Sequence, residues 1–459
     1  MSVSTTAVQT TAASAPGERA IRIEGGAPLR GTVTVGGSKN LALPALAAAL
    51  LTDEPCIFDN VPCIEDTRTM LRLLKALGAT ADPDPDDADF VETLSTHKRV
   101  TLRAATLART DAPSDLAKLM RASFLVVGPL LARCAAAAAP PPGGDAIGAR
   151  PLDVAIRSFK RMGATVVEHS AEKVSLATDR LTGAQLYLDY PSHTGTENLL
   201  MAASLASGTT TIINAACEPE VVALGNMLRR MGANIQGLGS PHVTVEGVSR
   251  LHGAYETIMP DRLVAGTFAI AAAITGGELT VRNVRAADMV PVTQKLREAG
   301  ATVFVDNDNA VMFVRAGEGL SAVDVQALPF PGFPTDQQAV FAVLLTQANG
   351  VSQIHERVFE DRLRYTEDLN QMGAAIRVDP LSVRAEITGP SPLRGAAVRC
   401  RDIRAGAALV LAGLVAEGET VVSGVEHLDR GYEALVPQLR ALGARISDTT
   451  VDAPAARRG

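Results

Sequence analysis

The sequence of 459 residues contains no tryptophan, and only 3% of its residues are aromatic. Single-stranded nucleic acid binds largely by stacking its bases on aromatic side chains, so this composition argues against that ligand. The formal net charge is −7, which gives no overall positive field to attract nucleic acid or an anionic membrane. We therefore expect neither as a partner, and an anionic ligand would have to be held by local arginines.

Cysteine is also scarce. The five cysteines form no C-x-x-C pair, and their odd number argues against a disulfide framework and favours a reducing cytoplasm. The longest apolar stretch, residues 41–51, is too short to cross a bilayer. Residues 1–20 lack the charged start and apolar segment of a signal peptide, so we expect a disordered tail. The sequence has no metal-ligand spacing and no G-x-G-x-x-G motif, so we expect no metal and no cofactor.

The chain contains a short sequence motif that recurs six times and ends in Gly-Ala. Each copy is typical of the last turn of an amphipathic helix, closed by a glycine and followed by a strand. Between the copies lie nearly continuous apolar segments, at 201–208, 269–276, 341–350 and 409–418, which predict helices buried on most sides. Six units of this size favour two globular domains of three units each. The glycines are Gly78, Gly163, Gly232, Gly300, Gly373 and Gly443.

The segment 142–153 carries the most specific local signal. Gly143, Gly144 and Gly148 free the backbone, while Asp145 and Arg150 place one acid and one cation close together. This combination predicts a lid that delivers a proton to an anionic substrate. The alternative is an ordinary surface turn, because glycine, proline and aspartate are common turn residues.

Together, the repeats and this loop resemble the enolpyruvyl transferases over about residues 21–446. The resemblance implies an α/β fold with two inside-out α/β domains, each of three repeated βαβαββ-type units, and a ligand cleft between them. The first domain would comprise residues 21–38 plus 262–450, the second residues 39–261 with the Asp145 loop, and residues 451–459 a tail. The motifs that carry it are Gly37-Ser38-Lys39-Asn40, Met120-Arg121-Ala122-Ser123, the Asp145 loop, Phe333-Pro334-Thr335-Asp336, Val358-Phe359-Glu360-Asp361-Arg362, Asp402-Ile403-Arg404-Ala405 and His427-Leu428-Asp429-Arg430-Gly431-Tyr432.

Within this family, the Asp145 loop and the segment 148–153 are similar to the branch that acts on a nucleotide sugar, rather than the branch that acts on shikimate 3-phosphate. The resemblance implies transfer of enolpyruvate from phosphoenolpyruvate to the 3-hydroxyl of UDP-N-acetylglucosamine, with release of phosphate. This reaction is the first committed step of peptidoglycan precursor synthesis. The expected partners are therefore phosphoenolpyruvate and a uridine nucleotide or nucleotide sugar.

The resemblance also implies the residue roles. Asp145 would be the general acid, Asp336 would receive or orient the hydroxyl proton, and Lys39 would complete the catalytic set. A single arginine is otherwise more often a surface charge, and Asp336 precedes an apolar run where it could cap a helix. The implied substrate-binding residues are Asn40, Arg121, Arg150, Pro151, Leu152, Asp153, Val154, Ser192, His193, Thr194, Val358, Arg362, Arg404 and Arg430.

The acid position most often holds cysteine in this family, with an aspartate subset. A free aspartate has a pKa of about 3.9, so we expect lid closure to raise the pKa of Asp145 by desolvation. We also expect resistance to fosfomycin, because its epoxide is captured by a thiolate.

The chain departs from the family on the phosphate and sugar side. Ala155 replaces a usual histidine, Tyr190 replaces a lysine found in some members, and Ser192-His193-Thr194 replaces a common Ser-Val-Gly. His193 is either an additional phosphate donor or a packed polar residue. Two alternatives follow: enolpyruvyl transfer to the 3′-hydroxyl of UMP in nucleoside-antibiotic biosynthesis, or an inactive paralogue that binds a uridine nucleotide.

Overall fold

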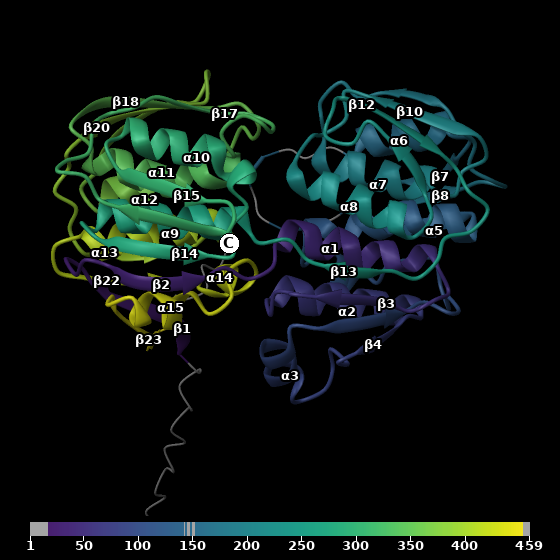
Figure 1. The fold of residues 1–459 in the computed structure, drawn as a ribbon, viewed down its shortest axis with the longest axis horizontal. Helices are drawn as coiled ribbons and strands as arrows, with labels where there is room; N and C mark the ends of the chain where they lie inside the picture. Colours follow the sequence, from purple (N-terminus) through teal and green to yellow (C-terminus); the bar gives the residue numbers. More distant parts are fainter. Residues whose placement is uncertain (1–16, 142, 145–146, 149–151, 453–459) are drawn as a thin grey trace, which may run out of the picture.

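The computed structural model describes residues 17–141, 143–144, 147–148 and 152–452, and all structural statements concern these residues. Asp145, Arg150 and Pro151 lie outside them. Two lobes lie side by side, and the purple N-terminal strands join the green and yellow lobe (Figure 1). The buried hydrophobic side chains form two clusters, one from residues 21–35 and 265–446, the other from residues 41–259. The predicted boundaries at 38/39 and 261/262 fall in the gaps between these clusters. We call the two lobes domain 1 and domain 2, respectively.

Six sheets are present in the described part of the chain, three in each domain. Each of the five four-stranded sheets combines one parallel pair with two antiparallel pairs, in the same order across the sheet. The sixth sheet has three strands, and an isolated parallel bridge between Asp111 and Ala138 stands where the other sheets have a fourth strand. The repeated architecture predicted from the six glycines is therefore confirmed.

Three sheets are completed by strands that lie far away in sequence. In domain 1, β1 joins β21, β22 and β23, and β2 joins β14, β15 and β16, while β17–β20 form the third sheet. The strands are β1 (Glu18–Glu24), β2 (Arg30–Thr34), β14 (Glu278–Arg282), β15 (Thr302–Asp306), β16 (Val311–Arg315), β17 (Val325–Ala327), β18 (Gly350–Glu356), β19 (Ala375–Asp379), β20 (Arg384–Gly389), β21 (Ala397–Arg399), β22 (Glu419–Ser423) and β23 (Arg445–Val451).

In domain 2, the distant strand is β13, which joins β3, β4 and β5 just before the chain returns to domain 1. The other two sheets are β6–β8 and β9–β12. Their strands are β3 (Cys56–Asp59), β4 (Thr80–Asp82), β5 (Val100–Arg103), β6 (Ala136–Ala139), β7 (Thr165–His169), β8 (Val174–Ala177), β9 (Gln185–Tyr187), β10 (Thr209–Ile213), β11 (Asn234–Gln236), β12 (His242–Glu246) and β13 (Tyr255–Thr257).

Each domain is built inside out around helices that are buried on nearly every side. In domain 1 these are α9 (Arg262–Ile274), α11 (Thr335–Gln347) and α13 (Ile403–Val415). In domain 2 they are α1 (Lys39–Ala48), α7 (His193–Ala203) and the continuous η2 (Arg121–Val126) and α5 (Val127–Cys134). Such apolar surfaces are stable only in a core, as the sequence predicted.

The remaining helices include the six that end in the recurring Gly-Ala motif. All six glycines have positive φ values, between 94° and 111°, which a side chain would disfavour, so the predicted helix ends are confirmed. These helices are α2 (Glu65–Leu77), α6 (Asp153–Arg161), α8 (Pro219–Arg230), α10 (Ala286–Glu298), α12 (Tyr365–Gln371) and α15 (Leu435–Ala441); the others are α3 (Phe90–His97), α4 (Ser114–Ala117), α14 (Glu426–Asp429) and η1 (Ala49–Leu51).

The expected tails need a correction at their inner ends. Strand β1 begins at Glu18 and pairs with both β22 and β23, so residues 18–20 belong to a sheet. Ile21 and Ile23 are buried there on one side of the strand, which gives it an apolar face that holds it in the sheet. At the other end, β23 runs to Val451, one residue into the expected tail.

Candidate active site

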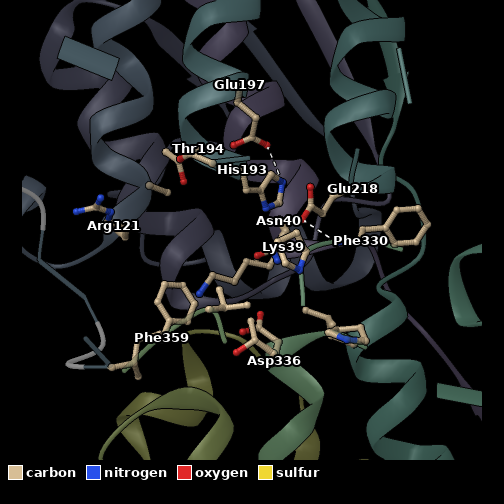
Figure 2. A pocket seen from close by; sticks show the side chains of 18 of the residues that line it. Lys39, Asn40, Arg121, His193, Thr194, Glu197, Glu218, Phe330, Asp336 and Phe359 are labelled. Atoms are coloured by element: carbon tan, nitrogen blue, oxygen red, sulfur yellow. Dashed lines mark hydrogen bonds and ion pairs between the residues drawn. The ribbon is translucent and has the colours of Figure 1, made fainter. Parts of the chain in front are cut away.

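A cavity of about 450 Å³ lies between the two domains and is lined by residues of both. Its wall contains the first residue of each buried central helix. Figure 2 shows His193 and Glu218 on the domain 2 side and Asp336 on the opposite side. The helix-starting residues in the wall are Lys39, Arg121, His193, Arg262, Thr335 and Ile403.

These converging helix starts make the cavity electropositive. The first N–H groups of a helix have no partner within the helix, and the aligned peptide dipoles add a partial positive charge there. Side chains cap only some of these ends among the described residues: Ser192 caps α7, Asp261 caps α9 and Asp402 caps α13. For α1, α11 and η2 the N-cap residue itself makes no side-chain cap in the same part of the chain, although Asp261 Oδ2 accepts from the backbone N–H of Lys39 at 3.2 Å. The cavity is therefore suited to an anionic ligand.

Asp336, in the first turn of α11, is held by two buried arginines. Its Oδ1 accepts from Nη2 of Arg362 at 2.5 Å, and its Oδ2 lies 3.4 Å from Nη2 of Arg404. Burial raises the pKa of Asp336, but Arg362 and Arg404, with a smaller contribution from Lys39, hold it well below its usual range. The N-cap position of α11 is occupied by Pro334, and Asp336 is the second residue of the helix. The simpler interpretation of Asp336 as a helix cap is therefore wrong.

A second carboxylate also joins two cations. Oδ2 of Asp66, in the first turn of α2, lies 2.5 Å from Nζ of Lys39. Its Oδ1 accepts from Nε of Arg430 at 2.9 Å. Lys39 and Asp66 belong to domain 2, whereas Arg430 follows α14 in domain 1, so this ion-pair group connects the domains across the cavity wall.

A third group of charges surrounds His193. Its Nε2 lies 3.3 Å from Oε1 of Glu197, one turn further along α7. Burial lowers the pKa of His193, but Glu197, Glu218 and Glu220 together raise it to about 10. Glu218 also accepts a hydrogen bond of 3.4 Å from the backbone N–H of Phe330 in domain 1. His193 therefore presents a positive charge at the start of α7.

The structure brings together most of the predicted site residues, but not all. Leu152 and Asp153 do not line the cavity, and Asp153 pairs instead with Arg157 on α6, at 2.8 Å. Asp145, Arg150 and Pro151 lie outside the described residues, so their predicted roles stay predictions. The predicted residues that line the cavity are Lys39, Asn40, Arg121, Val154, Ser192, His193, Thr194, Asp336, Val358, Arg362, Arg404 and Arg430.

Several lining residues were missed by sequence reasoning. Asp66 and Glu218 stand at the starts of α2 and α8, where an acidic residue is ordinarily explained by the helix dipole. Arg262 follows the capping residue of α9 and pairs with buried Glu220 at 2.9 Å. Only the long-range packing shows that these charges face one cavity.

In the described part of the chain, no cysteine lines this cavity. The same residues contain no group of three or more histidine, cysteine and acidic side chains that could hold a metal ion. No helix among them is long and apolar enough to cross a membrane.

Two domains of three repeated α/β units around an electropositive cavity are the architecture expected of an enolpyruvyl transferase. The family model described as EPSP synthase (3-phosphoshikimate 1-carboxyvinyltransferase) matches residues 23–439. The chain belongs to this family and is an enolpyruvyl transferase. The resemblance stated from sequence is therefore confirmed.

Relatives with a more specific name cover nearly the whole chain. The chain is 46% identical to the UDP-N-acetylglucosamine 1-carboxyvinyltransferase of Granulibacter bethesdensis, over 93% of this chain and 98% of the relative. It is 44% identical to UDP-N-acetylglucosamine 1-carboxyvinyltransferase 1 of Caldanaerobacter subterraneus, over 92% of this chain and 98% of that relative.

Solved structures agree on the fold. The enolpyruvyl transferase NikO from Streptomyces tendae superposes with a TM-score of 0.84 at 27% identity, covering 96% of this chain and all of NikO. An EPSP synthase from Acinetobacter baumannii gives a TM-score of 0.70 at 18% identity, covering 94% of this chain and all of that one, which supports the fold alone.

Proposed function

We propose that the protein transfers the enolpyruvyl group of phosphoenolpyruvate to the 3-hydroxyl of UDP-N-acetylglucosamine and releases phosphate. The observation that carries this proposal is the placement of Asp336 between Arg362 and Arg404 in the electropositive cavity. A deprotonated carboxylate beside several cations can orient a hydroxyl group next to an anionic co-substrate. The relatives named for this reaction, which span nearly the whole chain, support the choice of acceptor.

The reaction adds the hydroxyl oxygen to C2 of phosphoenolpyruvate while C3 takes a proton, and then eliminates phosphate while C3 loses a proton. In our proposal Lys39, Arg362, Arg404 and Arg430 bind the carboxylate and phosphate groups. Asp336 receives or orients the hydroxyl proton, and Asp145, from its place in the sequence, supplies the proton to C3. A low pKa makes Asp336 a weak base while Arg362 and Arg404 contact it. Anions that draw Arg362 and Arg404 away would make it more basic.

The uridine nucleotide would lie against Val154, Ser192, His193 and Thr194, which line the domain 2 side of the cavity. The positive charge of His193 and the N–H groups at the start of α7 suit a diphosphate there. We place the reaction in the cytoplasm, where both substrates are made and where unpaired cysteines remain reduced.

The test is phosphate release from phosphoenolpyruvate by the purified protein, with UDP-N-acetylglucosamine or UMP as acceptor. Turnover with UDP-N-acetylglucosamine, lost in Asp336→Asn, would support the proposal. Turnover with UMP alone would replace it with the nucleoside-antibiotic reaction. No turnover with either acceptor, in protein that still binds uridine nucleotides, would favour the inactive paralogue.

A further inference from the structure

The carboxylate of Asp66 lies beneath two cations that come from different domains. Its side chain is 4% exposed, whereas those of Lys39 and Arg430 are 12% and 16% exposed. Oδ2 of Asp66 lies 2.5 Å from Nζ of Lys39, and Oδ1 accepts from Nε of Arg430 at 2.9 Å. Nη2 of Arg430 also lies 3.5 Å from Oδ2. All three residues line the cavity.

This arrangement fixes the distance between the two cations. Lys39 has a flexible four-carbon stem, and its ammonium group can take many positions. Two cations this close repel each other strongly in a partly buried site. The single carboxylate offsets that repulsion and anchors both groups in the cavity wall.

We propose that Asp66 is a positioning residue that sets Lys39 and Arg430 as a matched pair for one phosphate group in the cavity. The phosphate group would be that of phosphoenolpyruvate, so this inference rests on the proposed function. The carboxylate itself would not contact the substrate, since the two cations cover it. It acts through them, and it also makes the phosphate site depend on the approach of domain 1 to domain 2.

A neighbouring ion pair supplies a matched control. Glu433, three residues after Arg430, pairs with Lys98 of domain 2, so it connects the same two domains. Neither Lys98 nor Glu433 lines the large cavity. Loss of this pair tests domain contact without touching the cations.

The experiment compares Asp66→Asn and Glu433→Gln with the unaltered protein. Calorimetry measures the dissociation constants of inorganic phosphate and phosphoenolpyruvate, and steady-state assays measure KM for each substrate. We expect Asp66→Asn to weaken phosphoenolpyruvate binding and raise its KM by about 100-fold, a typical cost of misplaced binding groups. The KM of the nucleotide acceptor and the values for Glu433→Gln should change little.

Several outcomes would overturn the proposal. Unchanged or tighter phosphate binding in Asp66→Asn would mean that the carboxylate only competes with the ligand. An equal loss in Glu433→Gln, or an equal rise in both KM values, would assign the effect to domain contact or to general structure. If Asp66→Asn does not fold, Asp66→Glu keeps the charge but displaces it, and an unchanged affinity in that variant would likewise reject the proposal.

The binding measurement separates this inference from the proposed function. Phosphate binding that depends on Asp66, in a protein that turns over neither acceptor, would leave the positioning role intact and reject only the proposed reaction. Normal turnover of UDP-N-acetylglucosamine by Asp66→Asn at unchanged KM would reject the positioning role and leave the proposed reaction intact.

Discussion

Nε2 of His193 and Oε1 of Glu197 lie 3.3 Å apart on consecutive turns of α7, at the wall of the cavity. Glu218 and Glu220 add to the negative surroundings, and together the three carboxylates raise the pKa of His193 to about 10 although burial lowers it. A histidine with this pKa is a permanent cation at neutral pH.

The stability of the protein should depend on pH through this residue. The pKa in the folded protein lies above the reference value of 6.5, so His193 stabilises the fold fully below about pH 6.5. That contribution is lost as the pH rises towards 10. We expect the urea midpoints of the unaltered protein and His193→Gln to differ most at pH 6 and to converge by pH 10. A difference that stays constant with pH would contradict the raised pKa.

Asp336→Asn should lose most of its activity while the fold survives. Its carboxylate is ionised across the usual assay range, because Arg362 and Arg404 lower its pKa. We therefore expect kcat to fall by about 100-fold to 10,000-fold, as for the loss of a general acid–base group. The acidic limb of the kcat/KM profile of the unaltered enzyme should come from another residue. A limb that vanishes in Asp336→Asn alone would show that Asp336 titrates there.

The buried ion pair between Glu220 and Arg262 should matter for stability. Their side chains are 0% and 8% exposed, and their closest contact is 2.9 Å. Glu220→Gln leaves a buried guanidinium without its charge partner, which we expect to cost about 3–5 kcal/mol in the free energy of unfolding. Glu298→Gln breaks an exposed pair with Lys295 and should cost less than about 1 kcal/mol. Chemical denaturation measures both, and equal costs would refute the argument from burial.

The enzyme should resist fosfomycin. In the described part of the chain no thiol lines the cavity, and the sequence places aspartate at the position where the family usually has the reactive cysteine. We expect no time-dependent inactivation of the unaltered enzyme and clear inactivation of Asp145→Cys. Mass spectrometry would check this, and an adduct on Asp145 itself would contradict the prediction.

The sequence predicted the repeats well because each signal is local. A glycine with positive φ that ends an amphipathic helix can be predicted from a few neighbouring residues, and all six recurring glycines have a positive φ. The strands β1, β2 and β13, which complete sheets far from their place in the chain, follow from pairing that no short segment encodes.

The site was predicted less completely, for the same reason. Lys39, Asp336 and four of the lining arginines were found through the family resemblance, but Asp66, Glu218 and Arg262 were not. Asp66 meets a partner 364 residues away, and Glu218 meets the backbone of Phe330 in the other domain. The neighbouring residues in sequence do not reveal contacts of this range, because an acidic residue at a helix start is already explained by the helix dipole.

The helix starts around the cavity also bear on how fast a ligand arrives. The chain as a whole is negative, with a formal charge of −7, so at long range it repels an anionic substrate. The aligned peptide dipoles and clustered cations reverse that potential over the last few ångströms. Capture should therefore accelerate as added salt screens the distant repulsion, until the Debye length approaches the dimensions of the cavity mouth and the local attraction is screened as well.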